Sequence, residues 1–205
     1  LLGYLPFETS SVLGDWNNGN RHPIVPQSVE DPELFNTDSY SKYRGALVLR
    51  LLRLELGEAT FFKTIRELFK KFAFQPVSTR QYQELVSRIA GKDMHWFFDQ
   101  WIYHTGHPVF EFNQAYDSVR KKLKLQIRQV QQADTSIQSL YTGYFQGKME
   151  VEIGDQKRIV QLLPRALNEF EFDLPAAPVF VNLDMHQQWI REIQMSRTSE
   201  VWLRI

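Results

Sequence analysis

Histidines are the residues of this sequence best suited to bind a transition metal. They are His22, His95, His104, His107 and His186. None is followed by Glu, so the chain lacks the H-E-x-x-H pattern, which places two zinc ligands and a general base on one helix face. His104 and His107 lie three residues apart and could share a metal, but no acidic third ligand lies nearby in the sequence. We therefore expect no metal site in this chain, and a solvated loop around this pair.

Other catalytic patterns are missing or unspecific. The sequence has no cysteine, no G-x-S-x-G turn around a serine nucleophile and no glycine-rich phosphate loop. The carboxylates that could in principle form an acid and base pair are Asp93, Asp99, Glu111 and Asp184. Their spacing singles out no two of them. We expect these side chains to cap helices or to lie on solvated surfaces.

The charge balance argues against a nucleic-acid partner. The 205 residues include 24 basic and 24 acidic side chains, so the chain has no overall field to attract nucleic acid. A basic run from Arg120 to Arg128 is typical of an edge strand, where lysines block pairing with another chain. The lack of cysteine excludes disulfides but leaves the compartment unknown, with cytoplasmic and exported locations both allowed.

A leucine-rich stretch from Tyr40 to Leu56 predicts the helix around which the other elements are organised. After its first turns only Arg50, Arg53 and Glu55 interrupt the apolar residues, so we expect this helix to lie inside a larger body. It is too short and too charged to span a bilayer, which argues against a membrane partner. Gly57 is suited to end it.

Two further helices are predicted after Gly57, one before and one after a helix-capping motif at Ser78. Residues Glu58 to Phe74 carry an aromatic seam at helical spacing. Ser78 and Gln81 form a capping box at the start of another helix, which Gly91 ends.

The last predicted helix lies close to a change in pattern. Asp93 can cap it, Gly106 ends it, and we expect Phe98 and Trp101 to be buried near that boundary. By contrast, Leu1 to Asn36 has many Gly, Asn and Pro residues and no sustained period, which predicts loops with short turns.

From Pro108 onward, apolar and polar residues alternate, which predicts half-buried antiparallel strands. Asp117-Ser118 and Gly154-Asp155 indicate turns, the second of them in a tight hairpin. Further strands are predicted at Phe170 to Leu174, Val179 to Leu183 and Trp189 to Ile193. Six or seven short strands of this kind favour a β-sandwich, so the fold class is α+β.

The stretch KYRGALVLRLLRLELGEATFFKTIREL resembles the aminopeptidase N family of zinc metallopeptidases, which are gluzincins with a thermolysin-like catalytic domain. Three further pieces agree in order: Ser78 to Gly91, then FFDQWIYHTGHPVF, then LKLQIRQVQ followed by VFVNLD. The resemblance covers residues 32–203. It implies that residues 1–107 form the helical second half of the catalytic domain, residues 108–195 a β-sandwich domain, and residues 196–205 the start of a C-terminal helical region.

By this resemblance the chain is a fragment that follows the zinc ligands, and N-terminal and C-terminal domains of the same protein are missing from it. The parent would be an enzyme that uses zinc to remove N-terminal residues from peptide substrates, whereas the fragment itself would have no cofactor and no activity. In the family, a tyrosine before the Leu-rich helix donates its hydroxyl to the oxyanion of the tetrahedral intermediate. The candidates for this role are Tyr43 and Tyr40.

The spacing of these tyrosines leaves an alternative open. The family has three steps from the tyrosine to the glycine, whereas Tyr40 lies five residues and Tyr43 two residues before Gly45. Each residue along a helix turns the side-chain direction by about 100°. Neither tyrosine therefore points in the direction that the family's tyrosine has relative to the glycine, unless the entrance of the helix is unwound. The alternative is a non-catalytic scaffold that keeps the architecture and acts through protein-protein contacts. A weaker alternative is an independent ligand-binding β-sandwich with a helical appendage.

Overall fold

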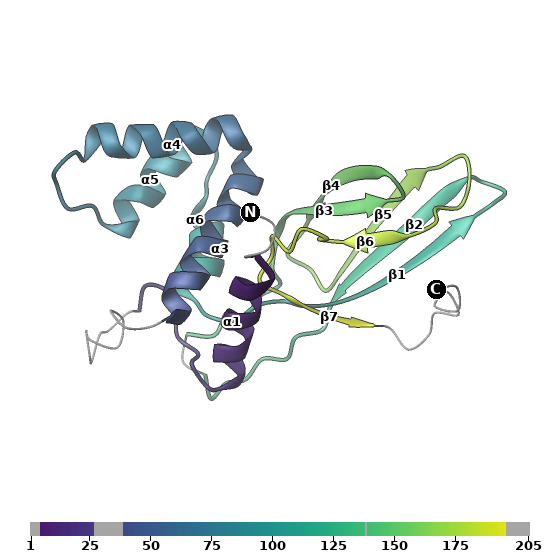
Figure 1. The fold of residues 1–205 in the computed structure, drawn as a ribbon, viewed down its shortest axis with the longest axis horizontal. Helices are drawn as coiled ribbons and strands as arrows, with labels where there is room; N and C mark the ends of the chain where they lie inside the picture. The colour runs from purple at the N-terminus through teal and green to yellow at the C-terminus, as the bar shows by residue number, and fades with distance from the viewer. Residues whose placement is uncertain (1–4, 27–38, 138, 196–205) are drawn as a thin grey trace. The chain divides into compact units, whose positions relative to one another are not determined.

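The computed structural model describes residues 5–26, 39–137 and 139–195, with helices first and strands second (Figure 1). The chain divides into two units. The first comprises the described residues up to Gly106 together with those of Asp134–Tyr141, and the second comprises His107–Ala133 and the described residues from Thr142 onward. The region expected to begin a further helical part, residues 196–205, lies outside the described residues.

The first unit is built from α-helices and one π-helix. These are α1 (Leu5–Asn17), α3 (Ser39–Leu56), α4 (Glu58–Lys71), α5 (Thr79–Ala90), α6 (His95–Phe98) and the π-helix η1 (Asp99–Tyr103). Among the described residues, no helix combines the length and the apolar character that a membrane span requires.

Helix α1 corrects the prediction of loops between Leu1 and Asn36. It packs against α3 and buries Thr9 and Val12. A short helix with a glycine, Gly14, inside it is marginal by itself, so its stability comes from packing on a neighbour. That contribution is invisible in the local sequence.

Helix α3 confirms the predicted central helix, but the described residues do not cover it on all sides. Leu47, Val48, Leu51 and Leu52 are at most 3% exposed, whereas Leu49 is 46% exposed. Two charged side chains of α3 are buried as well, Arg44 at 0% exposure and Glu55 at 4%. The described residues thus bury part of α3 and leave one stripe, which includes Leu49, facing outward. That α3 lies inside a larger body stays a prediction.

The next two helices begin and end close to the predicted positions. Gly57, at φ 78°, separates α3 from α4. The Ser78 side chain accepts from the backbone N–H of Gln81, the Gln81 side chain accepts from the N–H of Ser78, and Gly91 ends α5 in the left-handed region. The capping box is thus confirmed, and local chemistry alone fixes where α5 begins and ends.

The last predicted helix changes its winding halfway. Four residues of α-helix continue directly into η1, a π-helix, which ends at Tyr103. Phe98 and Trp101 are 2% and 1% exposed, which confirms their predicted burial. The wider winding was not predicted, because a π-helix has no sequence period of its own in so short a segment.

The second unit contains two sheets. Its strands are β1 (Val109–Asp117), β2 (Lys122–Gln129), β3 (Gly147–Ile153), β4 (Gln156–Leu162), β5 (Leu167–Asp173), β6 (Val181–Leu183) and β7 (Glu192–Met195). One sheet has the order β5-β2-β1-β7, the other β4-β3-β6. The predicted α+β class holds, although the ends of the last three strands differ from the predicted ones.

The two sheets share a core around Trp189. Its ring lies 5.8 Å from the ring of Phe110 on β1, and its Nε1 donates to the carbonyl of Lys148 on β3 at 2.9 Å. Buried residues alternate along the strands, as in Leu123 and Leu125. This arrangement is that of the expected β-sandwich.

Two predicted features of the sheets need correction. The basic strand β2 is not an edge strand, since it lies between β5 and β1. Its lysines instead face acids across the sheet, with Lys124 Nζ 2.8 Å from Glu169 Oε1. The sheets are also not wholly antiparallel, because β7 pairs with β1 in parallel, with Val109 opposite Glu192.

Candidate functional site

The entrance of α3 carries the two tyrosines singled out by the sequence. Tyr40 lies in the first turn of α3, and Tyr43 lies one turn later. The Tyr43 ring is half-buried and meets the ring of Phe7 on α1 edge to face, with 5.8 Å between ring centres. Lys42 Nζ lies 5.9 Å from the Tyr43 ring centre. Tyr43 is therefore held by a neighbouring helix and still has an exposed part.

Arg44, the residue after Tyr43, points into the interior. It is fully buried, and its Nη2 donates to the carbonyl oxygen of Gly106 at 3.0 Å. Its guanidinium carbon also lies 5.9 Å from the ring centre of Trp101 on η1. The first turns of α3 are thereby tied to the segment that follows η1.

The segment that receives this hydrogen bond is itself closely packed. Thr105 N donates to Ser139 O at 2.8 Å, and Tyr141 N donates to Thr105 O at 2.9 Å. Gly106 has φ +101°, and a Cβ at this position would lie 2.9 Å from Leu140 Cδ1. A side chain at this position would strain the backbone and press on Leu140, so glycine is the residue best suited to it.

The histidines do not gather into a metal site. His22, His95, His104, His107 and His186 lie, in that order, against Pro23 O, Asp93 Oδ1, Asp99 O, Glu192 Oε1 and Glu150 Oε1. The described part of the chain contains no group of three His, Cys, Asp or Glu residues that could hold a metal ion. His104 and His107, the pair that could have shared a metal, thus have different partners.

Two of the candidate acid and base carboxylates, Asp93 and Asp184, have partners close to them in the sequence. Asp93 accepts from the N–H of His95, and this hydrogen bond lowers the pKa of Asp93. Asp184 is fully buried, and it accepts at Oδ2 from Arg191 Nε at 3.1 Å. Burial raises the pKa of Asp184 to about 6, against the opposing effect of Arg191. Both carboxylates hold local structure.

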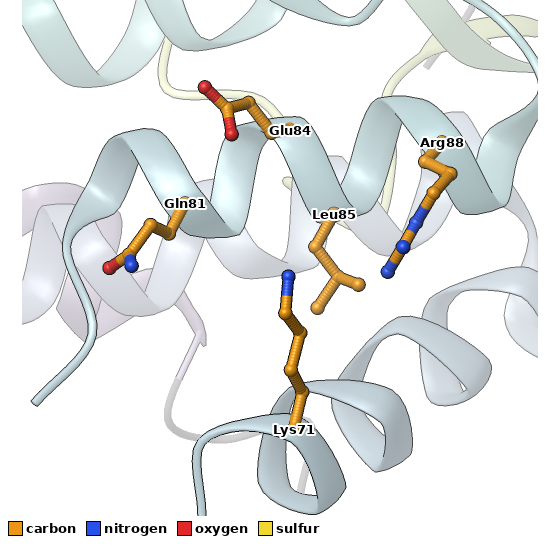
Figure 2. Close-up of a pocket in the computed structure, with 5 residues that line it drawn as sticks. All are labelled: Lys71, Gln81, Glu84, Leu85 and Arg88. Atoms are coloured by element: carbon orange, nitrogen blue, oxygen red, sulfur yellow. The ribbon is translucent and has the colours of Figure 1, made fainter. Parts of the chain in front are cut away.

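A small hollow of about 190 Å³ lies between α4 and α5 (Figure 2). Lys71 from α4 and Arg88 from α5 extend toward the same space beside Leu85, whereas the Glu84 carboxylate points away from it. A ligand pocket for a small molecule usually measures about 300–1,000 Å³. The hollow is smaller, and four of its five lining residues are exposed, so we assign it no substrate.

Comparisons with known proteins agree on one family. The family described as "Peptidase family M1 domain" matches residues 8–101, a stretch that includes α3. The match covers 94 of the 205 residues, which is less than half of the chain. The matched stretch contains Tyr40, Tyr43 and Arg44.

Two curated relatives are named aminopeptidases. "Probable aminopeptidase 1" of Sulfurisphaera tokodaii is 34% identical over 116 residues, which are 55% of this chain and 14% of that protein. "Aminopeptidase N" of Lactococcus lactis is 32% identical over 88 residues, which are 42% of this chain and 10% of that protein. This chain therefore spans only a small part of the length of either relative.

A solved structure shows the same fold over most of the chain. It is the structure of Legionella pneumophila aminopeptidase A in complex with aspartic acid, with a TM-score of 0.61 and 17% sequence identity. The match covers 77% of this chain and 18% of that one. At this identity, the likeness supports the fold of this chain and says nothing of its substrate.

The sequence singled out the α3 entrance as a candidate site but did not indicate that Arg44 is buried. Its neighbours in sequence are a lysine, a tyrosine and a glycine, which is a setting typical of a solvated arginine. The residues that bury it, Trp101 and Gly106, lie more than fifty positions away. No local pattern could have identified this contact.

Proposed function

We propose that the protein containing this chain is a zinc-dependent aminopeptidase that removes N-terminal residues from peptides. The observation that carries the proposal is the M1 match over residues 8–101, together with relatives named aminopeptidases at about one third identity. Within this enzyme, the chain supplies the helical half of the catalytic domain and a β-sandwich.

The residues described here do not fit the zinc ion itself. They include no cluster of three potential ligands, and the sequence has no H-E-x-x-H pattern. In the proposed enzyme the zinc is therefore held by other residues. We predict that this chain, purified alone and dialysed, contains no stoichiometric zinc by metal analysis. One zinc per chain that is lost on replacing His104 or His107 by Ala would contradict this prediction.

The chemical role proposed for this chain is to donate a hydrogen bond to the developing oxyanion. A phenol hydroxyl can stabilise that charge when it lies about 3 Å from the oxygen. Tyr43 is the better candidate, because its ring is braced by Phe7 and still partly exposed. Tyr40, one turn earlier in α3, is the alternative.

Substitution in the intact protein tests this role. Tyr43→Phe removes one hydroxyl and should lower kcat by a factor on the order of 10²–10³ with little change in stability. The matched control is Tyr103→Phe, because the Tyr103 hydroxyl donates to Gln83 within the helical unit and has no proposed catalytic role. Full activity in both Tyr43→Phe and Tyr40→Phe would show that neither tyrosine is the donor.

The scaffold alternative is favoured by one observation. The backbone from Ser39 to Leu56 is one continuous α-helix, so the entrance is not unwound to correct the phase of the tyrosines. Under this alternative, the intact protein binds no zinc and hydrolyses no aminoacyl substrate. The residues that precede this stretch in the intact protein give a direct test, since an H-E-x-x-H pattern followed by a second Glu on the next helix supports the enzyme.

A further inference from the structure

Arg44 is a fully buried arginine with long-range contacts. Its guanidinium donates to Gly106 O, 62 residues away in the sequence, and lies over the ring of Trp101. Burying a charged group is costly unless it is well paired, and an apolar side chain of similar volume often stabilises a core equally well. Its presence therefore calls for a role beyond filling space.

The position of Arg44 suggests what that role is. Arg44 directly follows Tyr43, within the first two turns of α3. The first turn of a helix has N–H groups without partners inside the helix and opens more readily than its centre. A donor to an oxyanion, however, must be held within about 0.5 Å of its working position. Something must keep these first turns in place.

We propose that Arg44 is a positioning residue for Tyr43, an inference that rests on the proposed function. The hydrogen bond to Gly106 anchors the backbone beside Tyr43 to the segment that follows η1, while Phe7 braces the Tyr43 ring. The anchor point lies in a segment held by backbone hydrogen bonds, from Thr105 N to Ser139 O and from Tyr141 N to Thr105 O. In this role Arg44 acts through Tyr43 and not on the substrate directly.

A double-mutant cycle in the intact protein tests this inference. Arg44→Met should lower kcat about 10- to 100-fold with little change in KM, because displacing a catalytic group by about 1 Å has effects of that size. In the Tyr43→Phe background the same substitution should have little further effect on kcat, because the hydroxyl that it misplaces is already absent. Arg44→Lys keeps the charge but not the planar donor geometry, and should fall between the wild type and Arg44→Met.

The control is an arginine on the same helix that lies outside the site. Arg53 is exposed and pairs with Glu58, so Arg53→Met should keep the wild-type kcat. Thermal unfolding of every variant identifies any that fails to fold. If Arg44→Met fails to fold, Arg44→Lys replaces it in the double-mutant cycle.

Three outcomes would overturn the inference. Equal fold-losses in kcat with and without the Tyr43 hydroxyl would show that Arg44 supports the fold alone, while the role of Tyr43 stands. A lowered kcat in Tyr43→Phe together with a wild-type kcat in Arg44→Met would likewise show that Arg44 does not position Tyr43. Full activity of Tyr43→Phe would instead remove the proposed role of Tyr43, and the inference about Arg44 with it.

Discussion

Each of the two units buries a charged side chain, and they do so in different ways. In the helical unit, Arg44 meets a backbone carbonyl and an aromatic ring that come from distant parts of the sequence. In the strand unit, Asp184 accepts hydrogen bonds from Arg191 Nε and from the N–H groups of Gln188 and Trp189, all within seven residues. One charge connects separate segments, whereas the other organises a single loop.

The difference indicates what each charge stabilises. The Asp184 cluster fixes the backbone of residues 184–191, in which Asp184 itself has a left-handed φ of 52°. Arg44 fixes how α3 lies against the end of η1. A substitution at Asp184 should therefore change the stability of the chain and the pH dependence of that stability. Substitutions around Arg44 should also change the geometry of the proposed site.

The largest expected change in stability comes from a residue that packs near Arg44. Trp101→Ala removes a fully packed ring and the aromatic face near Arg44, so it should lower the free energy of unfolding by roughly 3–5 kcal/mol. Chemical denaturation of the purified chain measures this loss. The control is Phe69→Ala, because Phe69 is 71% exposed, and a surface substitution usually changes stability by about 0.5 kcal/mol or less. Equal losses in the two variants would show that Trp101 is not part of the core.

On the Asp184 side, we expect a pH-dependent effect. The pKa of Asp184 is raised to about 6 in the folded state, mainly by burial, so the folded state binds the proton more tightly than the unfolded state does. The wild type should therefore gain stability relative to Asp184→Asn as the pH falls from about 7 to about 4, by up to about 3 kcal/mol.

Denaturation of both proteins across this pH range measures the gain. The comparison depends only on the change of their difference with pH, so any constant cost of the Asn side chain cancels. A difference that stays constant, or that moves in favour of Asp184→Asn at low pH, would contradict a raised pKa.

The smallest expected effect concerns the residue that receives the Arg44 hydrogen bond. Gly106→Ala places a Cβ at a positive φ and within 2.9 Å of Leu140 Cδ1, so it should destabilise the chain by at least about 1 kcal/mol. Gly14 lies inside α1 with open space around it, so Gly14→Ala should stabilise the chain by about 0.5–1 kcal/mol. Thermal unfolding should thus give opposite signs for the two alanines, and equal signs would refute the special geometry of Gly106.

The sequence predicted the elements better than it predicted their neighbours. The central helix, the capping box at Ser78 and the hairpin turn at Gly154-Asp155 were all recognised, since Ile153 lies opposite Gln156 as a two-residue turn requires. Helix α1 was missed because its stability depends on α3. The position of β2 inside its sheet was missed because the acids that face its lysines lie on β5, more than forty residues away.

The candidate site divides in the same way. The sequence alone pointed to Tyr40 and Tyr43, through a motif that spans a few residues and whose family the comparisons support. Only the tertiary structure showed that Arg44 is buried and bound to Gly106. Helix caps and turns are determined by hydrogen bonds over three or four positions, so they can be recognised in a short stretch of sequence. Whether a charge is buried depends on residues that meet only when the chain has folded, and for Arg44 those residues are Trp101 and Gly106.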